Sequence, residues 1–147
     1  MKRERLALIE AIKLQGLPAE CLEREKPLPL VSLEEFFIGN DAYGSIGCNL
    51  CDEHPGPQGF YEQLLRIRER PEVQDVLVEI HEVEEKDETM WPFSDRVYIV
   101  TKATKEEVAK WMLPLHPDEI EEGFAFGLPA NWPTLRPNMN VFGAWWD

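Results

Sequence analysis

The sequence predicts an α+β fold, with a small antiparallel or mixed sheet of three or more strands packed against several helices in a single domain spanning residues 1–147. Three patterns lead to this class: apolar residues at helical spacing in several segments, two segments that alternate β-branched and polar residues, and a largely apolar segment near the C-terminus. A chain of 147 residues, 44% of them hydrophobic, can bury a core without disulfides. The expected order is three helices, two strands, two helices and a strand.

Three helices are expected in the first half of the chain. An amphipathic helix from Lys2 to Gln15 ends at Gly16, because glycine favours helix termination. Prolines then keep the next segment extended, and a capping box opens a short helix from Ser32 through Phe37. The third helix begins at Pro57, carries apolar residues at i, i+4 and i+7, and ends before Pro71.

Two strands begin the second half of the chain. The segments from Asp75 to Val83 and from Arg96 to Lys102 alternate, with β-branched residues recurring on one side of each. The residues between them show no helical apolar face. An antiparallel pair is therefore the simplest connection.

The C-terminal third is predicted to contain two helices and a strand. A second capping box at Thr104 opens a helix that ends by Leu113, and Pro117 is expected to begin a short helix that ends near Gly123. The segment from Asn140 to Trp146 reads as a strand with apolar residues on both faces. Such a strand is either interior or an edge strand covered by a helix or a partner, and a free edge would allow a homodimer through sheet extension.

The charge narrows the classes of partner. The chain has 28 Asp and Glu residues but only 15 Lys and Arg residues. Its net charge of -13 repels the phosphates of nucleic acids. The acids concentrate in residues 72–88 and 118–122, where they form either a solvated surface or a face that attracts a basic partner. No apolar run approaches the ~20 residues of a membrane span. We therefore expect a cytoplasmic protein with reduced cysteines and no membrane attachment.

The segment from Gly39 to Phe60 holds five of the nine glycines and two of the three cysteines. Cys48, Cys51 and His54 form a C-x-x-C-x-x-H pattern, which resembles the first half of a zinc site. A complete structural site needs a second ligand pair, and the remaining cysteine and histidines offer no matching spacing. The main expectation is thus no cofactor, with Cys48 as a small buried hydrophobe and Cys51 incidental. Zinc is the alternative.

Other kinds of chemistry find less support. The cysteine pair lacks the strand-to-helix context of thiol exchange, and the glycines lack the lysine of a phosphate-binding loop. Neither a pair of carboxylates nor a Ser, His and Asp triad is singled out. The segment is predicted to be a glycine-rich connection, in which Asn40, Asp41, Asn49 and His54 offer polar contacts.

Tryptophans provide the remaining candidates for binding. Trp91 and Asp95 follow the most acidic segment, and Trp145 and Trp146 lie near the C-terminus. These rings either cap the ends of the sheet or anchor a partner, since tryptophan is common at interface hot spots. We expect a non-enzymatic protein that binds another protein, which the charge suggests is basic, as an inhibitor or immunity-type protein does. The alternative is a metal-binding or enzymatic protein built around residues 39–60.

Overall fold

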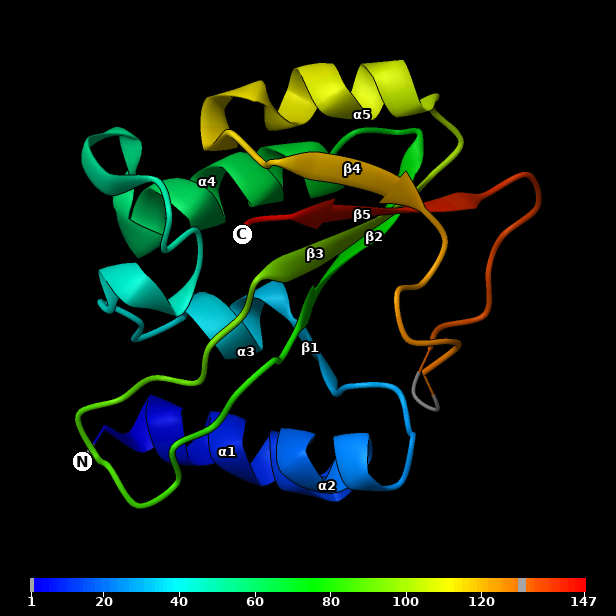
Figure 1. The fold of residues 1–147 in the computed structure, drawn as a ribbon. Helices are drawn as coiled ribbons and strands as arrows, with labels where there is room; N and C mark the ends of the chain where they lie inside the picture. The colour runs from blue at the N-terminus through cyan, green and yellow to red at the C-terminus, as the bar shows by residue number, and fades with distance from the viewer. Residues whose placement is uncertain (1, 130–131) are drawn as a thin grey trace.

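The computed structural model describes residues 2–129 and 132–147. Five strands form one antiparallel sheet in the order β1-β2-β3-β5-β4, packed with helices, which confirms the predicted α+β class (Figure 1). The strands are β1 (Leu30–Ser32), β2 (Val73–Glu79), β3 (Arg96–Thr101), β4 (Glu119–Glu122) and β5 (Asn140–Trp145). The helices are α1 (Arg3–Gln15), α2 (Pro18–Glu23), α3 (Leu33–Phe37), α4 (Gly56–Arg68) and α5 (Lys105–Met112).

Helices cover one face of the sheet. The main core joins side chains of β2, β3 and β5 to apolar residues of α1, α3, α4 and α5. On the other face Leu30, Tyr98 and Val141 pack with Phe124 and Trp132, which belong to the segment between β4 and β5. In Figure 1 this segment is the orange loop that leaves β4. Among the described residues, no helix has the length and apolarity needed to cross a membrane.

Local sequence signals located most elements correctly. Both capping boxes are present: the Ser32 hydroxyl accepts a hydrogen bond from the Glu35 amide at 3.0 Å, and the Thr104 hydroxyl accepts one from the Glu107 amide at 3.2 Å. The predicted antiparallel pair is also confirmed, since β2 and β3 pair with Val76 opposite Ile99. Elements with a clear periodicity or cap were therefore predictable.

Two predictions about single elements are wrong, and one strand was missed. The residues after Pro117 form the strand β4 instead of a helix, because exposed glutamates alternate there with Ile120, which packs on the core, and pairing with β5 favours this extended form. Pro18 begins the helix α2 instead of keeping the chain extended, since proline suits the first turn of a helix. The strand β1 was not predicted, because it is only three residues long.

The C-terminal strand β5 lies inside the sheet. It pairs with β3 on one side and with β4 on the other, so the interior alternative is correct. This strand therefore has no free edge through which the sheet could be extended. The sheet instead has β1 and β4 at its two edges.

A buried arginine fixes the acidic connection between β2 and β3. Arg5 of α1 is 2% exposed, and its guanidinium donates hydrogen bonds to the carbonyl oxygens of Met90, Glu84 and Asp87 at 2.7, 2.9 and 2.8 Å. These bonds hold the connection against α1. Figure 1 shows that it lies at the opposite end of the molecule from β4.

Candidate functional site

Residues 39–60 form a connection that is held together by its own side chains. Asn40 is buried, its Oδ1 accepts a hydrogen bond from the Ala42 amide at 2.9 Å, and its Nδ2 donates one to the Ser45 hydroxyl at 2.9 Å. The Ser45 carbonyl in turn accepts a bond from the Ser94 amide at 2.8 Å. Asn40 thus shapes the turn. Asp41 is exposed and pairs with Lys2 at 2.8 Å, and this ammonium holds the pKa of Asp41 below its usual value.

His54 is a structural residue of the same connection. Its Nδ1 accepts a hydrogen bond from the Gly56 amide at 2.8 Å, so its Nε2 carries the proton and donates to the Ile46 carbonyl at 2.7 Å. The ring lies between Tyr43 and Phe60, with centroid separations of 5.2 and 5.1 Å. Both ring nitrogens are therefore engaged by the backbone.

The cysteines do not assemble a metal site in the described part of the chain. Cys48 and Cys51 are both exposed, so the expectation that Cys48 is a buried hydrophobe is wrong, and the buried cysteine is Cys21. Among the residues that the structure describes, no three His, Cys, Asp or Glu side chains are grouped to hold an ion. Zinc binding by Cys48, Cys51 and His54 would require the histidine to give up a backbone hydrogen bond.

Two of the candidate tryptophans belong to the core. Trp91 is 7% exposed and donates its indole hydrogen bond to the Phe36 carbonyl at 3.0 Å, and Trp146 is 1% exposed and donates to the Leu115 carbonyl at 2.8 Å. These rings are not surface anchors. Trp145 is half-buried, and its indole nitrogen lies 3.4 Å from a carboxylate oxygen of Asp95. This pair lies at the end of the sheet, since Trp145 is the last residue of β5.

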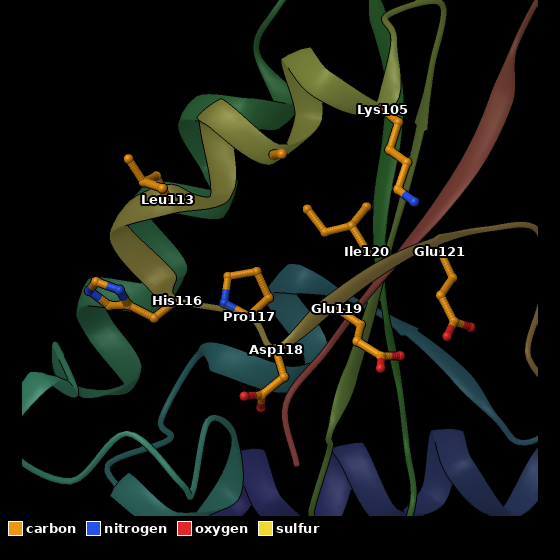
Figure 2. A pocket seen from close by; sticks show the side chains of 9 residues that line it. Lys105, Leu113, His116, Pro117, Asp118, Glu119, Ile120 and Glu121 are labelled. Atoms are coloured by element: carbon orange, nitrogen blue, oxygen red, sulfur yellow. The ribbon is translucent and has the colours of Figure 1, made fainter.

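An open groove lies between α5 and β4, and we call it the β4 groove (Figure 2). Its volume is about 740 Å³, and its walls are the outer flank of α5, the turn that follows this helix, and β4. Lys105 reaches over it from the start of α5, while Ile120 points toward the helix (Figure 2). Glu119 and Glu121 point away from the helix, on the other side of the strand (Figure 2). The groove thus has an apolar floor beside an acidic rim.

The rim of the groove brings the negative charges of Glu119 and Glu121 close together. The neighbouring Glu121 side chain, through a shared hydrogen bond and like charge, raises the pKa of Glu119 above its usual value. Arg96 acts in the opposite direction but does not cancel the effect. Both glutamates are exposed. A cation placed against β4 would relieve this repulsion.

Asp118 connects the β4 groove to the glycine-rich connection and to the C-terminus. One of its carboxylate oxygens accepts hydrogen bonds from the Asn49 amide group at 2.6 Å and from the Asp147 backbone amide at 2.7 Å. Next to it, His116 adopts a left-handed backbone conformation with φ of 50°, and its Nε2 lies 3.9 Å from Glu53. Of the predicted polar residues of the connection, Asn49 is therefore the one that reaches the groove.

The carboxyl group of Glu79 is buried beneath the segment between β4 and β5. Glu79 is 2% exposed and accepts a hydrogen bond from the Tyr98 hydroxyl at 2.9 Å, and that hydroxyl accepts one from the Ala125 amide at 3.1 Å. Burial raises the pKa of Glu79 to about 7, against the opposing effects of Tyr98 and of Arg96, whose Nε lies 3.7 Å away. This carboxyl is therefore enclosed by the protein.

Comparison with known proteins places the chain in a family. Residues 4–144 match the Uncharacterized protein YfbO family. The chain belongs to the YfbO family. One YfbO relative, "Uncharacterized protein YfbO" of Escherichia coli (strain K12), is 42% identical over 136 residues, which cover 92% of this chain and 94% of the relative. No solved structure matches the chain.

Sequence reasoning missed the residues that shape the groove in this YfbO family member. The acidic stretch 118–122 was recognised by its charge, but it was assigned to a helix, which would have spread its carboxylates around an axis. The alternation of Glu119, Ile120 and Glu121 was the available signal for a strand. Lys105 and Leu113 carried no signal, because only the packing of α5 beside β4 brings them to the groove.

The glycine-rich connection should be intolerant of a side chain at Gly47. This residue has φ of +63°, and a Cβ there would lie 2.6 Å from Cζ of the buried Phe60. We expect Gly47→Ala to lower the free energy of unfolding by about 2 kcal/mol or more, from backbone strain together with overpacking. Gly44→Ala is the matched control, because a Cβ there meets nothing within 4 Å. Urea unfolding of both variants is the measurement, and equal losses would contradict this account of the connection.

Glu79 should make stability depend on pH. Its pKa is raised from 4.5 to about 7 on folding, so between these values the folded protein keeps a proton that the unfolded chain releases. The free energy of unfolding should therefore fall as pH rises through this window, by up to about 3 kcal/mol for a fully realised shift. In Glu79→Gln this part of the slope should vanish. Urea unfolding at a series of pH values checks this, and Glu82→Gln, an exposed neighbour, should keep the wild-type slope.

Proposed function

We propose that this protein binds a basic protein partner through the β4 groove without catalysing a reaction, in the manner of an inhibitor or immunity-type protein. The observation that carries the proposal is the crowding of Glu119 and Glu121 on an exposed strand, where the carboxylates repel each other. Binding of a cationic group to this surface is favourable, because it reduces the repulsion between the two carboxylates. The net charge of -13 would speed the encounter.

The composition of the groove also supports a protein partner. Leu113 is 69% exposed at its margin, and Ile120 is half-buried in its floor. Apolar contact area beside charged groups is the usual composition of a protein interface, in which the apolar part supplies affinity and the charges supply orientation. The carboxylates of Glu119 and Glu121 border this area on the side that faces away from α5.

The second acidic stretch is a weaker candidate. In the connection between β2 and β3, Glu85 already forms an ion pair with Lys13. Asp87 accepts hydrogen bonds from the Thr89 amide and hydroxyl at 3.0 and 2.6 Å. These two carboxylates are therefore already engaged within the molecule.

A capture experiment with charge variants tests the proposal. The tagged protein is used to retain proteins from a lysate of its source organism at low and high salt, and each retained protein is identified, purified and titrated by calorimetry. We expect a basic protein that binds in a simple stoichiometry and loses affinity as salt increases. The triple variant Glu119→Gln, Glu121→Gln, Glu122→Gln removes the three exposed carboxylates of β4. It should bind this protein about tenfold more weakly or worse, as the loss of three surface charge pairs would give.

The matched control has the same net charge and the same kind of change. It carries Glu82→Gln, Glu84→Gln and Glu88→Gln, at three exposed positions on the opposite end of the molecule. Its affinity should stay near that of the unchanged protein. Equal weakening of both triple variants would show that net charge alone acts, and retention of only acidic or salt-insensitive partners would contradict the proposed function.

A further inference from the structure

We infer that the outer edge of β4 accepts an extended segment of the basic partner as an additional antiparallel strand, with cationic and apolar side chains in alternation. This inference rests on the proposed function and specifies how the β4 groove is used. Three observations support it. The backbone of β4 has an open edge, its side chains from Glu119 to Glu121 alternate between charged and apolar, and the opposite edge of the sheet is covered by a glutamine side chain.

The backbone of β4 has an open edge. The strand is last in the sheet, and in the described part of the chain no other strand pairs with its outer side. On its inner side the Gly123 amide donates to the Val141 carbonyl at 2.8 Å, and Glu121 lies opposite Gly143. Because ladder bonds alternate along an antiparallel strand, the backbone groups of Ile120 and Glu122 point outward. These are the donors and acceptors that a new strand would meet.

The opposite edge of the sheet is closed. In β1 the Leu30 amide donates to Oε1 of Gln15 at 2.9 Å, and the Leu30 carbonyl accepts from Nε2 of the same side chain at 2.7 Å. The Gln15 amide group therefore occupies the place that a neighbouring strand would take. Strand addition is thus directed to β4, which has no such cover among the described residues.

Side-chain alternation on β4 defines the pattern of the incoming strand. Residues directly opposite each other in an antiparallel pair have Cβ atoms about 4.5–5.5 Å apart. Cationic residues would then face Glu119 and Glu121 on one side of the sheet. The residues between them would face Ile120, the flank of α5 and, at the end of the strand, the exposed Glu122. Near the helix Lys105 disfavours a cation, and the exposed Leu113 favours an apolar side chain.

The same charges exclude a second copy of this chain as the occupant. Pairing of two β4 strands would set glutamates against glutamates, and like charges directly opposite each other destabilise a sheet. Charged edge strands also prevent unspecific association of edges. The edge of β4 thus rejects copies of itself while it remains open to an oppositely charged strand.

Three synthetic peptides of equal charge provide the test. The first is a capped heptapeptide that alternates lysine and valine, beginning and ending with lysine. In the second, the three valines are N-methylated, which removes the amide donors that would face Ile120 and Glu122. In the third, three lysines are N-methylated instead, and their amides would face away from β4. Each is titrated into isotope-labelled protein, and affinity is read from amide shifts by NMR.

We expect the first and third peptides to bind with similar affinity, with the largest shifts at Ile120 and Glu122. The second should bind about tenfold more weakly or worse, because two backbone hydrogen bonds are lost. Equal binding of all three peptides would overturn strand addition and leave charge attraction, so the proposed function would stand. Binding of none, or selective weakening of the third, would also overturn the inference, while the capture experiment judges the proposed function separately.

Discussion

The structure depends on the insertion of the C-terminal strand β5 between β3 and β4. Ala144 is fully buried in this strand, and the lack of a side chain at Gly143 leaves room for Tyr98, since a Cβ there would lie 3.1 Å from the tyrosine ring. Beyond the strand, the Trp146 indole bonds to the Leu115 carbonyl and fixes its end against the turn after α5. Because β5 lies inside the sheet, β4 is the edge strand, and its carboxylates are exposed on the surface of the molecule.

The two edges of the sheet are treated in different ways. In β1 the Gln15 side chain forms hydrogen bonds with the outward-facing backbone groups of Leu30. In β4 the outward-facing backbone groups have no such cover among the described residues, and its negative charges disfavour pairing with a second copy of the same strand. Among the described residues, the sheet therefore has one open edge, and this edge lies beside the β4 groove. The glycine-rich connection contacts this edge where the Asn49 side chain donates a hydrogen bond to Asp118.

The sequence predicted the parts of the fold that have local causes. Capping boxes at Ser32 and Thr104 and the alternation of β2 and β3 depend on residues close in the chain, and the structure confirms them. The strands β1 and β4 are three and four residues long, and they exist because distant strands pair with them. At β4, the short alternation of Glu119, Ile120 and Glu121 competed with a proline-based helix signal at Pro117.

The candidate site was only partly predictable for the same reason. The acidic stretch could be read directly, but its exposure at a sheet edge depends on pairing with β5, which is distant in the chain. Asn40 and His54 have polar groups suited to a partner, and the structure uses them inside the connection instead. Burial of Trp91 and Trp146 follows from tertiary packing, which their proline-rich or terminal positions do not reveal.

Amide hydrogen exchange in the free protein tests the central claim most directly, because the claim is that β4 presents an uncovered edge. The account predicts fast exchange at Ile120 and Glu122, together with slow exchange at Phe142 and Ala144 inside the sheet. Strong protection of Ile120 and Glu122, comparable with that of Phe142, would contradict it, because the edge would then be covered in solution.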